Sequence, residues 1–310
     1  HIYINGEHIA YKTKSLQTIH PGLNFTTLKE GASYYNGDMS VPVLFSKVLS
    51  DKEISQLVAK GYTRNTDERI LDWIPYADTR SLLAWSDGNY EFVTSDGIKR
   101  EVKVEKTGSP VMINQKWEVS FPKGLGAPEK ISLTKLFSLH RHEDEGVKYF
   151  SGTATYKTNF VVKPSMMSED RVVFLDLGAV EVMAEVIVNG VNKGIFWSRP
   201  YLIDVTDVLK PGENTLEIKV TNQWTNRLIG DEQLPEENEY VPGGGVNGIA
   251  ALSRGAIRKL PDWYRNGVNK PEGGRVAFTT WKHYRKDSPL IESGLIGPVR
   301  LIPAKKIEFE

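Results

Sequence analysis

Short apolar segments separated by turn signals, between residues 172 and 231, constrain the fold more than any other part of the chain. Residues 172–175 and 184–188 are rich in β-branched side chains, and Asn189-Gly190 follows the second segment. Asn-Gly is a strong hairpin signal, because both residues accept the positive φ angles of a type I′ turn. Residues 215–221 alternate between polar and apolar side chains, as a half-buried strand does. The stretch therefore predicts an antiparallel β-sandwich.

The same stretch carries an ordered set of segments: LDLG, AEVIVNG, KGIFW, PYLIDVTDVLKPGEN and LEIKVTNQWTNRLIGDEQLP. Together they resemble the galactose-binding-like β-sandwich of glycoside hydrolases. They are similar to the sugar-binding domain of family 2, and more closely to the ancillary domain of family 106 α-L-rhamnosidases. KWEVSFP and VKYFSGTATYKTNF upstream, and FTTWKHYRKDSPLIESGLIGPVRL downstream, extend the likeness over roughly the last two-thirds of the chain. The resemblance implies an all-β fold, with a galactose-binding-like jelly roll at residues 108–304.

The first segment has its own pattern. Residues 1–11 read as a strand, an Asn-Gly turn and a second strand, and Ser50 with Glu53 forms the capping box of a helix ending near Gly61. IYINGEHIA and NGDMSVPVLFSKVLSDKEISQLVAKG resemble the end of a laminin-G/concanavalin-like jelly roll, whose first half is missing here. We therefore expect a partial concanavalin-like segment and a fragment of a longer protein; alternatively, another part of the chain completes the sheet. The predicted domains are 1–61 for this segment, 62–107 for a small β linker unit, 108–304 for the sandwich and 305–310 for a tail.

Composition excludes several classes of function. The chain has 39 Lys and Arg against 39 Asp and Glu, so its net charge is zero, which argues against attraction of the whole surface to nucleic acid or anionic membrane. It has no Cys, so disulfides, thiolate chemistry and Cys-ligated metals are excluded. No run of about 18 apolar residues is present, so no membrane span is expected. We expect a bacterial periplasmic or extracellular protein.

A cluster of aromatic and polar residues follows the last strand of the stretch. Sugars present C–H faces that stack on aromatic rings and hydroxyl groups that hydrogen-bond to Arg, Asn and carboxylate side chains. The alternative is that the tryptophans are core residues and that Arg227 and Asp231 form a structural ion pair. The predicted carbohydrate-binding residues are Trp224, Asn226, Arg227, Asp231, Glu232, Trp197, Tyr201, Trp281 and His283.

Metal sites are weakly indicated. His140 and His142 would share one face of a strand, and three acidic residues follow them, but this spacing is not distinctive for a metal. The resemblance also implies a structural calcium ion, for which Asp176, Asp204 and Asp207 are candidates. No other cofactor is expected.

No catalytic residue is assigned. A glycosidase needs two carboxyl groups about 5–10 Å apart, and no pair here is marked by its spacing. The resemblance places the acid and base of family 106 enzymes on a (β/α)₈ barrel, whose alternating strand–helix pattern this sequence lacks.

The resulting hypothesis is the non-catalytic C-terminal portion of an α-L-rhamnosidase-like glycoside hydrolase. It would brace the catalytic barrel of the same parent protein and bind an oligo- or polysaccharide. Two alternatives stay open: a stand-alone lectin-like module without enzyme activity, and a hydrolase with its own site on the sandwich.

Overall fold

A computed structural model describes residues 2–4, 7–10, 50, 52, 71–73, 81–93, 97–241, 255–270 and 273–308. The chain forms two compact units, residues 1–67 and residues 68–310. In the first unit, β1 (Ile2–Ile4) pairs antiparallel with β2 (Glu7–Ala10), which confirms the two predicted strands, whereas the Asn5-Gly6 turn predicted between them lies outside the described residues. The rest of the laminin-G-like prediction, including nearly all of the helix that Ser50 would begin, lies outside the described residues.

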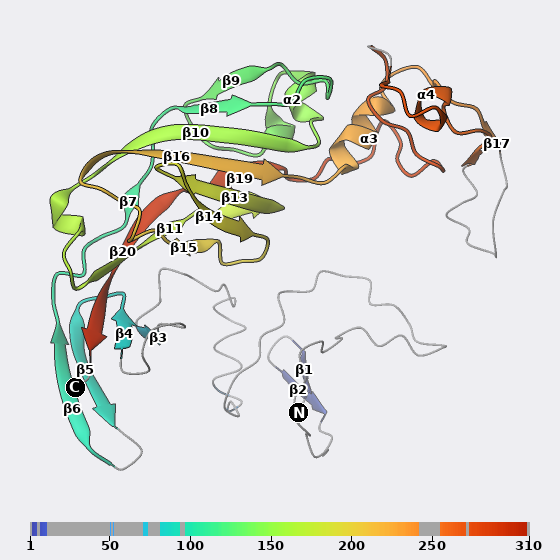
Figure 1. Cartoon of the computed structure of the whole chain (residues 1–310). Coiled ribbons are helices and arrows are strands. Elements are labelled where there is room, and N and C mark those ends of the chain that lie inside the picture. The colour runs from blue at the N-terminus through green and yellow to red at the C-terminus, as the bar shows by residue number, and fades with distance from the viewer. Residues whose placement is uncertain are drawn as a thin grey trace. The chain divides into compact units, whose positions relative to one another are not determined.

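Two six-stranded antiparallel sheets form the main part of the second unit, and three two-stranded sheets accompany them in its described residues. In the first sheet, the two longest strands, β10 and β16, run side by side over ten residue pairs (Figure 1). Its order is β14 (Val191–Phe196), β13 (Met183–Val188), β16 (Gly212–Thr221), β10 (Thr153–Val162), β8 (Trp117–Ser120) and β9 (Lys130–Leu133).

The second sheet is centred on β20 (Arg300–Glu308), which pairs with strands from earlier parts of the second unit. Its order is β15 (Leu202–Asp204), β11 (Arg171–Asp176), β20, β4 (Ser81–Ala84) and β3 (Leu71–Trp73), with β7 (Val111–Met112) also paired to β20.

Two expected domain boundaries differ from this sheet. Residues 305–308 belong to β20 rather than to a tail, and β4 of the expected linker unit pairs with them. The physical reason is burial, because Ile307 packs with Leu82, Ala84 and Val104 in a small apolar cluster. The β5 (Gly88–Val93) and β6 (Lys99–Val104) hairpin covers the same cluster.

The core of the sandwich follows from strict alternation along the long strands. Tyr156 of β10 lies opposite Ile218 of β16, and both are fully buried, whereas the neighbouring side chains of both strands face outward. The opposing sheet contributes Val173 and Leu175 of β11 to the same core. The prediction of an all-β, galactose-binding-like sandwich is therefore confirmed.

Short elements complete the description. Residues 278–284 begin the downstream segment FTTWKHYRKDSPLIESGLIGPVRL, and we expected them to form a closing strand of the sandwich. Only a single bridge, between Trp281 and Ala256, is present there. No helix in the described part of the chain is long and apolar enough to cross a membrane. The remaining elements are β12 (Ala179–Glu181) with β19 (Gly294–Gly297), β17 (Tyr240–Val241) with β18 (Ala256–Ile257), the helices α2 (Glu145–Lys148), α3 (Thr225–Asp231) and α4 (Asp262–Arg265), and the 3-10 turns η2 (Leu139–Arg141) and η3 (Pro164–Met166).

Candidate carbohydrate-binding region

Helix α3 follows the end of β16 in the first sheet, and it carries three of the predicted binding residues: Asn226, Arg227 and Asp231. The turn before it is fixed by Asn222, whose side chain accepts a hydrogen bond from the Gly152 amide at 2.8 Å and donates one to the Phe150 carbonyl at 2.8 Å. The sequence predicts a loop after Trp224. Instead this segment forms a seven-residue helix with Asn226, Arg227 and Asp231 buried.

Each of these three residues has a polar partner within the protein, although Arg227 Nε has only an ion-pair contact and no hydrogen bond. Asn226 donates to the Ile291 carbonyl at 2.8 Å and accepts from the Ile291 amide at 2.9 Å. Arg227 Nε lies 3.1 Å from Asp231 Oδ1, one helical turn away. Exposures of 1%, 5% and 2% for Asn226, Arg227 and Asp231 leave them little contact with solvent. The geometry corresponds to the structural ion pair that the sequence left as the alternative.

A long Gly-rich insertion was expected at residues 231–275. Asp231 also anchors the chain that returns from this insertion. Its two carboxylate oxygens accept hydrogen bonds from the backbone amides of Val276 and Ala277, at 2.9 and 2.8 Å. Carboxylates that accept from consecutive amides are held in one orientation and offset the cost of burying the charge. The helix and the returning segment are thereby fastened together.

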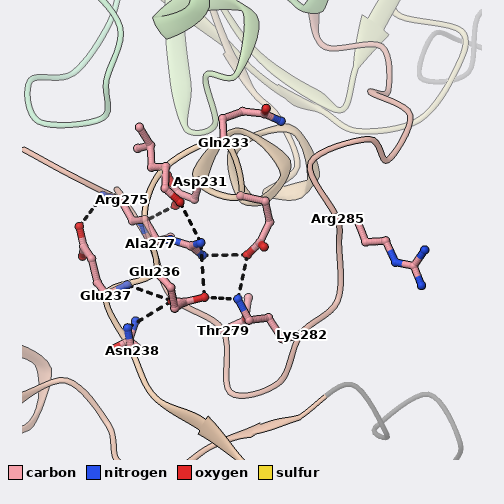
Figure 2. A network of polar contacts seen from close by, with 12 residues as sticks. Asp231, Gln233, Glu236, Glu237, Asn238, Arg275, Ala277, Thr279, Lys282 and Arg285 are labelled. Atoms are coloured by element: carbon pink, nitrogen blue, oxygen red, sulfur yellow. Dashed lines mark hydrogen bonds and ion pairs between the residues drawn. The ribbon is translucent and has the colours of Figure 1, made fainter. Parts of the chain in front are cut away.

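A second polar network surrounds Arg275, and Figure 2 shows its members converging from both ends of the insertion. Arg275 Nη1 is 2.8 Å from Glu232, and Arg275 Nη2 is 3.4 Å from Glu236. Lys282 bridges the same two carboxylates and lies 4.5 Å from the centre of the Tyr240 ring. Glu232, predicted to bind sugar, is thus a member of an ion-pair network.

The charge balance of this network affects the titration of Glu236. Burial raises the pKa of Glu236, but hydrogen bonds from Lys282 and the Asn238 amide, together with the Arg275 charge, outweigh it. The pKa of Glu236 therefore lies below its usual value, so the Glu236 carboxyl group is ionised at neutral pH.

The exposed predicted residues gather beside α3. Trp224 is 53% exposed, and the neighbouring Thr225 hydroxyl lies 3.3 Å from the Tyr284 hydroxyl. The Tyr284 ring is 5.9 Å from that of His283, which is 4.3 Å from the ring of Trp281. Trp281, His283 and Tyr284 therefore form one aromatic group, and Trp224 precedes Thr225, the residue that contacts this group. We call these four residues, Trp224, Trp281, His283 and Tyr284, the α3 platform. Tyr284 was missed because the segment was interpreted as a strand.

The other two aromatic candidates lie between β14 and β15. Trp197 is 73% exposed. Tyr201 is buried, and its hydroxyl donates to the Val182 carbonyl at 2.6 Å. Burial, followed by the Glu181 charge, raises the pKa of the Tyr201 hydroxyl, as expected for a core residue.

The candidate calcium ligands have separate partners. Asp176 pairs with Arg300 at 3.0 Å, Asp204 accepts from the Thr206 amide and hydroxyl, and Asp207 pairs with Lys193 at 2.7 Å. Across the described ranges, no group of three or more His, Asp or Glu side chains has a geometry that could hold a metal ion. These three residues therefore do not fit a common calcium site.

His140 and His142 also have local contacts. His140 Nδ1 lies 2.6 Å from the Ser138 hydroxyl, and His142 Nδ1 accepts from the Asp144 amide at 3.0 Å. Both residues therefore contribute to the turn structure around η2 and α2.

The sandwich matches a known type of domain. Residues 137–264 match the family described as "Glycosyl hydrolase 2 galactose-binding domain-like", a range that includes α3. A Formosa agariphila protein named "Putative beta-glucuronidase" is 40% identical over 214 residues, which is 69% of this chain and 17% of the relative. The chain therefore spans about a sixth of the length of that relative.

Solved structures of glycoside hydrolases are also similar. A rhamnosidase from Novosphingobium sp. PP1Y is 26% identical with a TM-score of 0.49, over 83% of this chain and 26% of that one. A β-glucuronidase from Ruminococcus gnavus is 18% identical with a TM-score of 0.36, over 64% of this chain and 29% of that one. With the match at residues 137–264, the chain is an all-β protein with a galactose-binding-like sandwich, similar over these residues to a domain of glycosyl hydrolase 2 proteins.

Proposed function

We propose that this chain is a non-catalytic part of a glycoside hydrolase, where it supports the catalytic domain and contacts the carbohydrate substrate. The observation that carries the proposal is the match of residues 137–264 to a galactose-binding-like domain of glycosyl hydrolases. The 40% identical relative supports it, because most of its length lies beyond the aligned region and has room for a catalytic domain. A protein with this role meets polysaccharide, so we place it in the bacterial periplasm or outside the cell.

The α3 platform is the proposed carbohydrate contact. Exposed indole and imidazole rings offer apolar faces for sugar C–H groups, and the Tyr284 hydroxyl, which lies near the Thr225 hydroxyl, offers a hydrogen bond. Asn226, Arg227 and Asp231 then act indirectly, by fixing the helix on which Trp224 is placed.

Two substrate classes follow for the parent enzyme. The sequence segments resemble the ancillary domain of α-L-rhamnosidases, whereas the Formosa agariphila relative is named as a β-glucuronidase. Assays of the parent enzyme with aryl α-L-rhamnosides and aryl β-D-glucuronides separate the two. The enzyme without this domain should lose activity or stability. If the isolated chain itself released sugar from either substrate, the non-catalytic assignment would be wrong.

Titration calorimetry of the chain with oligosaccharides tests the platform. Trp224→Ala and Trp281→Ala should each weaken binding about tenfold, equivalent to about 1.4 kcal/mol, through loss of stacking. Trp197→Ala is the matched control, because it removes an exposed indole outside the platform. If the control weakens binding equally, the platform is not the contact.

A further inference from the structure

A surface hollow lies in the insertion, and none of the predicted carbohydrate-binding residues lines it. It is a surface cleft of about 650 Å³, within the size range of ligand sites in proteins. Three segments that are distant in sequence form its walls: residues 237–239, residues 258–263, and Lys270 with Gly273 and Gly274.

One aromatic residue of the cleft wall is held in a fixed orientation. The half-buried Trp263 of α4 meets Phe278 edge to face, with ring centres 5.6 Å apart and planes at 82°. It meets Tyr264 in the same way, at 6.0 Å and 87°. An aromatic ring fixed by its neighbours loses little conformational entropy when a ligand packs on it.

The polar lining of the cleft is balanced in charge. Arg258 lies 3.1 Å from Glu239, Lys259 lies 2.7 Å from Asp262, and Lys270 lies 3.2 Å from Glu237. Three cations and three carboxylates thus cancel, and a charged ligand gains no net attraction from them. A neutral ligand with many hydroxyl groups can use both the donors and the acceptors.

One wall of the cleft requires glycine at position 274. Gly274 has a φ angle of +66°, and a Cβ atom built there would lie 1.9 Å from Glu237 Oε1. The same carboxylate oxygen accepts a hydrogen bond from the Arg275 amide at 2.7 Å. Glycine at this position therefore lets the Glu237 carboxylate lie directly against the backbone of Gly274, with its orientation fixed by the Arg275 amide.

From these features we propose that the cleft around Trp263 binds an uncharged segment of an oligosaccharide, as a subsite separate from the α3 platform. The proposal rests on the proposed carbohydrate-binding function and extends it to a second site. The ring of Trp263 packs on a sugar face, and the charged pairs and Asn238 exchange hydrogen bonds with the hydroxyl groups.

The test is titration calorimetry of the whole chain with neutral tetrasaccharides of rhamnose, galactose or glucose, and with matching uronate-containing tetrasaccharides. Trp263→Ala should weaken binding of a neutral tetrasaccharide about tenfold. Affinity should change by less than about twofold when salt is raised, because a neutral ligand gives the counterions nothing to screen. Glu239→Gln, at a largely exposed residue, should weaken binding several-fold without affecting the fold.

The variants separate this proposal from the platform. Melting temperatures of both cleft variants show whether the insertion is intact, and Glu239→Gln keeps the test valid if Trp263→Ala unfolds it. If Trp224→Ala abolishes binding while Glu239→Gln and a folded Trp263→Ala bind normally, the cleft proposal is overturned and the platform stands. Binding of uronates alone, with steep salt dependence, overturns the neutral ligand class. Absence of binding to every sugar overturns both sites.

Discussion

Asp231 makes three polar contacts from a buried position. It pairs with the buried Arg227 across one helical turn and accepts hydrogen bonds from two consecutive backbone amides of the returning segment. In a site this buried, each of these groups would be left without a partner if the carboxylate were removed. The residue therefore joins α3 to the end of the insertion.

Asp231→Ala should lower the free energy of unfolding by about 3–5 kcal/mol, because it leaves a buried guanidinium and two amides unpaired. Urea denaturation measures the change. The control is Asp207→Ala, because Asp207 pairs with Lys193 at an exposed position and should contribute less than about 1 kcal/mol. Equal effects of the two substitutions would contradict the buried role of Asp231.

His140 makes stability dependent on pH. Burial lowers the pKa of His140, and the charges of Arg141 and Lys148 lower it further against the opposing charge of Glu292. The unfolded chain therefore binds a proton first as pH falls below about 6.5, so the folded state loses stability in that range. Urea midpoints at about pH 7.5 and about pH 5 should differ less in His140→Gln than in the natural chain. An unchanged difference would assign the effect to other groups.

At the scale of elements, close backbone approach fixes how β12 meets β19. Gly178 has a φ angle of +64° and lies beside Gly297, where an added Cβ would be 2.4 Å from the carbonyl carbon. No side chain fits this gap, because the nearest atoms belong to the backbone of Gly297 and Pro298, which cannot move aside without distorting the chain. Gly178 is therefore required by space as well as by conformation.

Gly178→Ala should cost at least twice as much stability as Gly190→Ala, measured by thermal unfolding. Gly190 also has a positive φ angle, +81°, but nothing lies within 4 Å of its added Cβ. Its substitution costs only the backbone term of about 1–2 kcal/mol. A similar loss in both variants would show that the contact with Gly297 relaxes.

The strands of the sandwich were predictable where alternation and turn residues agree. The Asn189-Gly190 turn and the alternation in residues 215–221 correspond to the β13–β14 hairpin and to β16. A strand was also expected at residues 278–284, yet only a single bridge at Trp281 forms there, because their aromatic rings pack against each other and α4 rather than across a sheet. Alternation reports which side chains share a face, and says nothing of whether a partner strand is present.

The candidate site was predictable in composition but not in role. The sequence identified the pairing of Arg227 with Asp231 only as an alternative, because burial depends on Val276 and Ala277, which return from the far end of the insertion. The cleft around Trp263 was also missed, since its walls come from segments that only the fold brings together. Sequence patterns report local periodicity, whereas these features depend on distant contacts.

At the scale of the whole second unit, β20 connects the sandwich to the strands that precede it. Residues 305–308 pair with β4, and Ile307 closes the apolar cluster shared with the β5–β6 hairpin. The other end of β20 pairs with β11 and β7. Loss of its last residues should therefore affect one region and spare the other.

A chain shortened after Ala304 should show faster amide exchange in β4, β5 and β6, with β10 and β16 still protected, because only the first group loses its partner. Hydrogen exchange with mass spectrometry resolves the two regions. The matched control is a chain that lacks only residues 309–310. Loss of protection throughout would show that the second unit unfolds as a single cooperative block.

The same strand sets an order of events during synthesis. Lys305 donates a hydrogen bond to the carbonyl of Glu105, 200 residues earlier in the chain. At roughly 5–20 residues per second, the ribosome needs about 10–40 seconds to make that interval. Leu82, Ala84 and Val104 therefore lack their contact with Ile307 for at least this time. These early strands of the second unit, β4 and β6, are thus covered only when its last strand has been made.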